Sequence, residues 1–133
     1  MSSAEQDLIQ TYFAPLAGDG AAGLMDDAAT WVPARGMETV LSTDTLVSGV
    51  HFVGNEPADL VARKALRVNF SDLAAKGAVP CGYLLNLALS PAQDGAWLKR
   101  FSAGLAQDQS EFECMLLGGD TVSTPGPLVV PVT

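Results

Sequence analysis

Residues 82–89 read Gly82-Tyr83-Leu84-Leu85-Asn86-Leu87-Ala88-Leu89, an apolar run that lies between Pro80 and Pro91. Such a run is short for a helix and of the right length for a strand, and its nearly continuous hydrophobicity predicts a strand that is buried on both faces. Helix-forming and strand-forming stretches follow each other on either side. They predict helices at residues 58–76 and 93–110 and strands at residues 114–117 and 128–132.

The amino-terminal part of the chain is less regular. Apolar side chains recur on one helical face over residues 4–16, which predicts a first helix, and clustered glycines predict a loop at 17–27. Two β-prone stretches, 28–32 and 37–43, flank a turn at Pro33-Ala34-Arg35-Gly36 and predict a hairpin. The whole order predicts an α/β fold, a mixed β-sheet with helices on one face, in a single domain that spans residues 1–133.

Composition excludes several classes of function. The 133 residues include 7 basic and 15 acidic side chains, a formal charge of -8, and 48% are hydrophobic, so the chain can bury a core but repels phosphate backbones and anionic lipid. We therefore expect no nucleic acid partner and no membrane partner. The acidic start of the chain and the lack of a long apolar stretch predict a cytoplasmic protein. Cys81 and Cys114 are expected to be buried free thiols.

The side chains that most clearly suggest a binding or catalytic role are five aspartates. Each follows small, polar or glycine-rich residues at the end of an apolar run, and the flanks of Asp44 and Asp120 predict carboxylates at the carboxyl ends of strands, where open α/β sheets bind ligands. Converging carboxylates repel each other and need cations, and hard oxygen donors select Mg²⁺ or Ca²⁺. The alternative is that these aspartates only cap helices and turns. The residues concerned are Asp26, Asp27, Asp44, Asp72 and Asp120.

Other motifs point less clearly to a function. The segment from Gly18 to Gly23 matches G-x-G-x-x-G, but it follows a predicted helix, so a flexible loop is the better interpretation. His51 is the only histidine and stands among apolar neighbours, where a lone histidine is more often packed and hydrogen-bonded than functional. Arg63, Lys64 and Arg67 on one predicted helix favour a solvated face over a phosphate contact.

The aspartates, together with the residues on either side of them, match the motifs of a known protein family. The chain resembles the thiamine-monophosphate kinase family of the AIR synthase-related superfamily over almost its whole length, and the order and spacing of the matching segments make the likeness specific. The segments are Met25-Asp26-Asp27-Ala28-Ala29, Ser42-Thr43-Asp44-Thr45-Leu46-Val47, Gly49-Val50-His51-Phe52, the helix from Lys64 to Gly77, and Leu117-Gly118-Gly119-Asp120-Thr121.

The resemblance implies ATP-dependent phosphorylation of thiamine monophosphate to thiamine diphosphate. It implies Mg²⁺ as the metal, His51 as a substrate contact, and a homodimer whose amino-terminal sheets pair into a shared barrel. The implied metal ligands are Asp27, Ser42, Thr43, Asp44, Asp72 and Asp120, and the implied nucleotide contacts are Asp27, Gly119 and Asp120. This chemistry suits phosphoryl transfer, which depends on positioning and charge neutralisation.

Two features depart from the family pattern. Met25 stands where the family has glycine, and family members are about twice as long, so we expect an amino-terminal fragment without the carboxy-terminal domain and without turnover on its own. Two alternatives stay open. One is another ATP-dependent enzyme of the superfamily, such as a selenophosphate synthetase or a hydrogenase maturation factor, and the other is a non-catalytic dimerisation and Mg-nucleotide-binding module.

Overall fold

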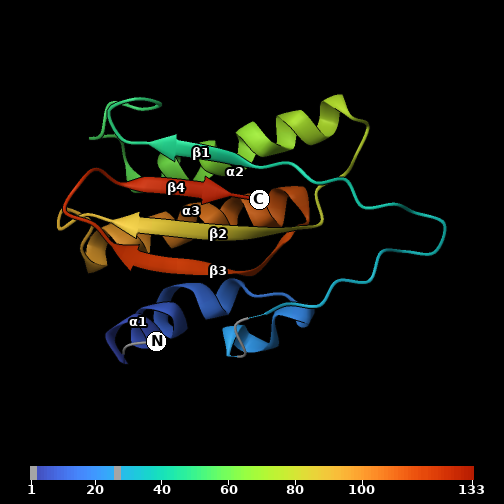
Figure 1. Ribbon diagram of the computed structural model, residues 1–133, viewed down its shortest axis with the longest axis horizontal. Helices are drawn as coiled ribbons and strands as arrows, with labels where there is room; N and C mark the ends of the chain where they lie inside the picture. Colours follow the sequence, from blue (N-terminus) through green and yellow to red (C-terminus); the bar gives the residue numbers. More distant parts are fainter. Residues whose placement is uncertain (1–2, 26–27) are drawn as a thin grey trace.

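The computed structural model describes residues 3–25 and 28–133 and contains one four-stranded mixed sheet. Two long helices, α2 and α3, cover one face of this sheet, and the other face is open, as Figure 1 shows. The predicted fold class, a mixed sheet with helices on one face, is confirmed. The elements in chain order are α1 (Ser3–Leu8), η1 (Ile9–Phe13), η2 (Ala14–Leu16), η3 (Asp19–Leu24), β1 (Asp44–Val47), α2 (Ala58–Ala75), β2 (Gly82–Leu89), α3 (Gly95–Phe112), β3 (Met115–Ser123) and β4 (Val129–Val132).

The strand predicted at residues 82–89 is β2, and it lies inside the sheet. The strand order is β1-β4-β2-β3, with β2 parallel to β3 and antiparallel to β4, which is in turn antiparallel to β1. Leu85 and Leu87 are buried under the helices, but Leu84 is 43% exposed and Asn86 is also exposed on the open face. The prediction of burial on both faces is therefore wrong, because helices cover only one side of the sheet.

Residues that favour helix ends mark termini of the two long helices. The α2 helix starts after Pro57 and ends at Lys76, with the following Gly77 at a φ of 76°. Asp94 caps α3 by accepting a hydrogen bond from the Trp97 N–H at 2.9 Å. Both bury one face in the common core, whose fully buried members include Leu66 of α2 and Phe101 of α3.

Charged side chains join α2 to α3. Asp108 is 0% exposed and accepts hydrogen bonds from Arg63 Nε at 3.2 Å, Arg67 Nε at 3.0 Å and Arg67 Nη2 at 3.1 Å. Arg67 also reaches Glu111 at 3.1 Å. The solvated face expected for this part of the helix is wrong for the half-buried Arg63. Arg67 is exposed as expected, but both arginines are held by carboxylates of the neighbouring helix.

The amino-terminal segment differs from the single predicted helix. Only α1 is an α-helix; η1 is a wider helical turn and η2 and η3 are tighter ones. Figure 1 places this segment along the outer edge of β3, where Gly18 N–H donates to the Leu116 carbonyl at 2.9 Å. The irregular turns allow the segment to cover a strand edge that would otherwise be unpaired.

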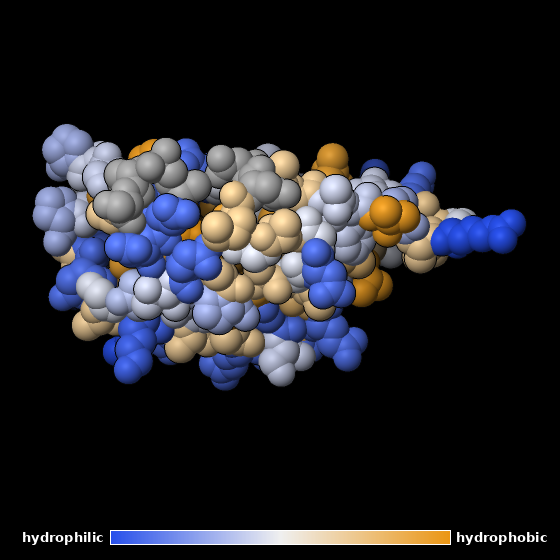
Figure 2. Space-filling view, turned by 90° about the horizontal axis from the view of Figure 1, so that it is seen from below, coloured by the Kyte–Doolittle hydropathy of each residue, from blue (hydrophilic) through white to orange (hydrophobic). Residues whose placement is uncertain are grey.

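The predicted hairpin is wrong. Residues 28–43 contain no strand, although the turn forms, with Met37 N–H donating to the Ala34 carbonyl at 3.0 Å. Every residue from 28 to 39 is exposed, so β-prone side chains such as Trp31, at 46% exposure, bury too little surface to favour a strand. Figure 2, seen from the side of the amino-terminal segment, shows part of the protein projecting well beyond its body, with a hydrophilic tip. Figure 1 identifies this projection as the loop within residues 28–43.

The two cysteines are also placed differently from the prediction. Cys114 is buried, but Cys81 is exposed. They precede strands that pair in parallel, with Gly82 opposite Met115, and Met115 N–H donates to the Cys81 carbonyl at 3.2 Å. Burial, the Asp108 charge and the nearby Cys81 raise the pKa of Cys114 to about 11.

Candidate active site

Asp44 lies at the start of β1, not at the carboxyl end of a strand as the sequence predicted. It pairs with Val132, and its side chain shares the helix-facing side of the sheet with the buried Leu46 two residues on. The preceding residues, predicted as a strand, are an extended loop instead. The half-buried Asp44 carboxylate therefore lies between the edge of the sheet and α2.

Asp72, from the last turns of α2, is a direct neighbour of Asp44. Burial, a side-chain hydrogen bond to Asp72 and the charge of Asp72 together raise the pKa of Asp44, while the nearby His51 lowers it. A hydrogen bond between two carboxyl groups needs a proton between them, because two carboxylate anions cannot both ionise at contact. A divalent cation satisfies the same two groups without the proton, so this pair fits a hard metal such as Mg²⁺.

His51 completes the group from the turn after β1. Its Nδ1 accepts a hydrogen bond from Val47 N–H at 2.9 Å, and the Lys64 ammonium group donates to its backbone carbonyl. The ring is exposed, so the expected packing among apolar neighbours is wrong, but the expected hydrogen bond is present. The structure thus brings together three of the predicted side chains, Asp44, Asp72 and His51, on one edge of the molecule.

Ser42 and Thr43 adjoin this edge. The Thr43 hydroxyl donates to the Val132 carbonyl at 3.0 Å and lies 3.0 Å from the hydroxyl of Thr133. It therefore fastens the entry of β1 to the end of β4. Ser42 is half-buried directly before it.

Asp120 is not part of the same group. It lies inside β3, opposite the exposed Asn86 on the open face of the sheet, whereas Asp44 shares a row with the buried Val132 and Leu85 on the helix-covered face. Three strand-to-strand steps separate the two aspartates, about 14 Å at the usual spacing. Within the described residues, no group of three or more histidine, cysteine or acidic side chains is arranged to hold a metal.

Asp120 also differs from the prediction in its place along the strand. The run expected to end at residue 117 continues through Gly118 and Gly119 to Ser123, because β3 keeps its pairing with β2 past an irregularity at Leu117. The Asp120 carboxylate accepts a hydrogen bond from Thr121 N–H at 3.0 Å. Asp26 and Asp27 lie outside the described residues.

Gly119 has a structural reason to be glycine. Its φ is 152°, and a Cβ atom there would lie 1.6 Å from the Leu85 carbonyl oxygen. The close approach of β3 to β2 at this point therefore requires a residue without a side chain.

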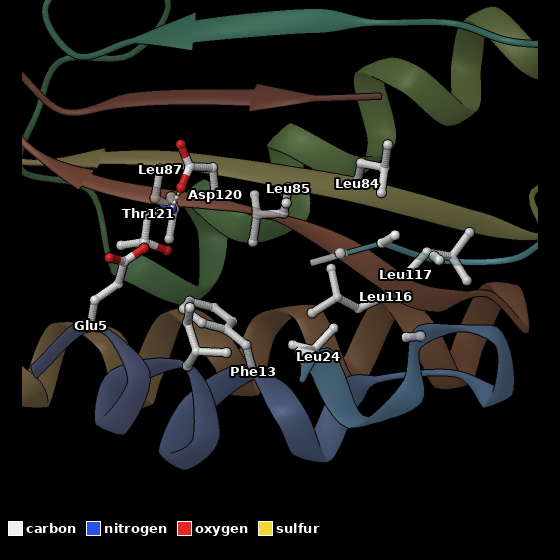
Figure 3. Close-up of a pocket in the computed structure, with 16 residues that line it drawn as sticks. Glu5, Phe13, Leu24, Leu84, Leu85, Leu87, Leu116, Leu117, Asp120 and Thr121 are labelled. Atoms are coloured by element: carbon white, nitrogen blue, oxygen red, sulfur yellow. Dashed lines mark hydrogen bonds between the residues drawn. The ribbon is translucent and has the colours of Figure 1, made fainter. Parts of the chain in front are cut away.

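A half-open pocket adjoins Gly119 and Asp120. It lies between the amino-terminal segment and strands β2 and β3, with a volume of about 110 Å³. Figure 3 shows Phe13 and Leu24 from the amino-terminal segment facing Leu85 and Leu116 of the sheet. At one end of the pocket lie the polar side chains of Glu5, Asp120 and Thr121. The sequence did not single out the amino-terminal lining, since its helical periodicity predicted only a core-facing helix.

Comparison with known proteins identifies the class to which this fold and these residues belong. Residues 25–133 match the family described as AIR synthase related protein, N-terminal domain, so the chain belongs to that family. Hydrogenase maturation protein HypE, in a complex with ATP, shares the fold at 20% identity, with a TM-score of 0.76 over 98% of this chain and 39% of that one.

Within this family the chain is most clearly similar to thiamine-monophosphate kinases. The enzyme of Caulobacter vibrioides is 48% identical over 131 residues, which are 97% of this chain and 37% of that protein. The crystal structure of the Stenotrophomonas maltophilia kinase is 38% identical, with a TM-score of 0.74 over 90% of this chain and 38% of that one. A further structure, AaThiL complexed with AMPPCP and TMP, is 30% identical, with a TM-score of 0.65 over 68% of this chain and 29% of that one.

The chain thus spans little more than a third of the length of the Caulobacter relative. In the described part of the chain, no helix is both long enough and apolar enough to cross a bilayer.

Proposed function

We propose that this chain takes part in the ATP-dependent phosphorylation of thiamine monophosphate to thiamine diphosphate, with Mg²⁺ as the metal. The observation that carries this proposal is the paired Asp44 and Asp72 carboxylates with His51 beside them. The names of the relatives and the AMPPCP and TMP ligands of a related structure support the same reaction.

In this proposal Asp44 and Asp72 hold Mg²⁺, with Ser42, Thr43 and Asp27 as further ligands directly or through water. Asp120, about 14 Å away on the open face of the sheet, would ligate a separate Mg²⁺ ion. The metal would neutralise charge on the phosphates that react. The two carboxylates would fix the position of the metal. His51 contacts the thiamine monophosphate, for which its second ring nitrogen is free of protein hydrogen bonds in the described structure.

Gly119 and Asp120, together with Asp27, are proposed to contact the nucleotide. The apolar pocket of about 110 Å³ beside Gly119 and Asp120 supports this assignment. Apolar walls with a few polar groups at one end are typical of small-molecule sites. Asp120 would be compatible with phosphate only when a cation lies between them.

The open face of the sheet supports a homodimer. Leu84, Met115 and Val122 are each more than two-fifths exposed, and an apolar surface of this kind favours association with another sheet. We expect light scattering at tens of micromolar to give twice the monomer mass. Leu84→Asp should give the monomer, while the control Leu60→Asp, at a similarly exposed position on α2, should not. A wild-type monomer at that concentration would contradict the dimer.

Calorimetric titration tests the proposed function. Mg-ATP, with and without thiamine monophosphate, should release heat with the wild-type chain and none with Asp44→Asn. Asp7→Asn, which removes the same charge from exposed α1, is the matched control and should bind normally. Unchanged affinity in Asp44→Asn would refute the metal site.

One alternative function is favoured by a specific observation. Since only two of the predicted carboxylates meet in the described structure, the chain could be a Mg-nucleotide-binding and dimerisation module without catalysis. Turnover of ATP and thiamine monophosphate by the chain would contradict this alternative. Binding of both ligands without turnover would favour it.

A further inference from the structure

The turn after β1 holds His51 through several backbone hydrogen bonds. The N–H groups of Val50 and His51 donate to the Val47 carbonyl at 3.1 and 3.0 Å, and Gly49 N–H donates to the Phe52 carbonyl at 2.7 Å. Val47 N–H donates in the opposite direction, to His51 Nδ1 at 2.9 Å. The imidazole is therefore folded back onto the last residue of the strand.

This contact fixes the tautomer of the ring. A backbone N–H can only donate, so Nδ1 must be the unprotonated nitrogen, and a neutral imidazole then carries its hydrogen on Nε2. Among the contacts of the described residues, Nε2 has no hydrogen-bond acceptor. The His51 ring lies on the same edge as Asp44, close enough for the two side chains to interact electrostatically.

Two further side chains hold the backbone on either side of the ring. Lys64, one turn and a half into α2, donates from its ammonium group to the His51 carbonyl. The Glu56 carboxylate accepts hydrogen bonds from Val53 N–H at 2.7 Å and Gly54 N–H at 2.9 Å. Lys64 is the contact that ties this turn to a rigid helix, since Glu56 holds only the loop of which it is part.

We propose that Lys64 is a positioning residue, which holds His51 with Nε2–H available as a hydrogen-bond donor to a phosphate oxygen of the substrate. The inference rests on the proposed function, because it takes the Asp44 edge as the place where a phosphate ester binds. Asp44 and Asp72 repel such an anion unless a cation and hydrogen-bond donors are also present. A neutral imidazole with a fixed tautomer supplies a donor on the same edge of the molecule.

Because His51 is the only histidine of the chain, nitrogen-15 NMR can test this inference without assignment ambiguity. When the ring is neutral, Nδ1 should have the shift of an unprotonated nitrogen and Nε2 that of a protonated one. A scalar coupling between Val47 N and His51 Nδ1 should be visible across the hydrogen bond. In Lys64→Met this coupling should disappear, and exchange of the Val47 amide hydrogen should become about tenfold faster.

The controls separate positioning from charge. Lys64→Arg should keep the coupling, because the guanidinium group can also donate to the His51 carbonyl. Lys76→Met removes the same charge at the end of the same helix, and it should keep the coupling too. Absence of the coupling in the wild-type chain, or its persistence in Lys64→Met, would overturn the positioning role.

Ligand titration tests the donor role. With Mg²⁺ and thiamine monophosphate added, the Nε2 resonance should move more than the Nδ1 resonance. If calorimetry detects binding but Nε2 does not move, the donor role is refuted and the proposed function stands. If calorimetry detects no binding of Mg-ATP or thiamine monophosphate, the proposed function fails, and with it the donor role; the coupling still decides whether Lys64 positions His51.

Discussion

Replacing Asp108 by asparagine is predicted to destabilise the protein more than any other single change among its ion pairs. The Asp108 carboxylate is 0% exposed and accepts three hydrogen bonds from Arg63 and Arg67. Asparagine has nearly the same shape as aspartate but no charge. One of the two carboxyl oxygens is replaced by an NH₂ group, which cannot accept hydrogen bonds from the guanidinium groups. The variant therefore leaves at least one arginine donor without its partner.

The expected loss of free energy of unfolding in Asp108→Asn depends on how deeply the ion pair is buried. Removing one partner of a buried ion pair costs about 3–5 kcal/mol, but the arginine side chains here are 25% and 42% exposed and can regain water, so we expect the lower end, about 3 kcal/mol. The surface pair of Asp59 with Arg100, at 2.7 Å, gives a matched control, and Asp59→Asn should cost less than about 1 kcal/mol.

Urea unfolding followed by circular dichroism measures both variants. The urea concentration at the unfolding midpoint of Asp108→Asn should be well below that of Asp59→Asn, and the dependence of the free energy of unfolding on urea concentration should be the same in both variants. If the two variants lose the same free energy of unfolding, the network that joins α2 to α3 does not stabilise the fold, and the reasoning from burial is refuted.

Three further predictions concern the site and its surroundings. The raised pKa of Asp44 means that the folded protein holds this proton more tightly than the unfolded chain, so stability should fall as pH rises from about 3.8 through the raised value. Asp44→Asn should flatten that slope in thermal melts, and an unchanged slope would contradict the shift. Thiol titration of the native protein should modify Cys81 quickly and Cys114 only after unfolding; equal rates would contradict the burial of Cys114. Gly119→Ala should cost about 3 kcal/mol or more, whereas Gly118→Ala, whose new Cβ would meet its nearest neighbour at 3.6 Å, should be tolerated in the same urea assay.

Much of the fold could be predicted from local patterns. The strand at residues 82–89 has its predicted bounds, and the second and third helices, predicted at 58–76 and 93–110, differ by at most two residues at each end. These elements carry strong apolar periodicity and clear boundary residues, so the signal lies within the element itself. The hairpin predicted at 28–43 failed because the apolar side chains of this segment stay largely exposed and bury too little surface to favour strands.

The residues of the candidate site could be predicted from the sequence, but their arrangement in space could not. The sequence and the family resemblance indicated Asp44, Asp72 and His51 individually, since the residue types and their flanks are local. They could not show that Asp44 and Asp72 are neighbours while Asp120 faces the other side of the sheet. That outcome depends on strand register, where a shift of one residue reverses the face on which a side chain lies.

The sequence by itself determined which residues form the central strand and the two covering helices, and which family the chain resembles. Only the tertiary structure decided which carboxylates meet, that Lys64 contacts the His51 carbonyl, and that the two cysteines precede neighbouring strands. The physical reason is that helix and strand formation depends on neighbours in the chain, whereas these contacts join residues that only packing and strand pairing bring together.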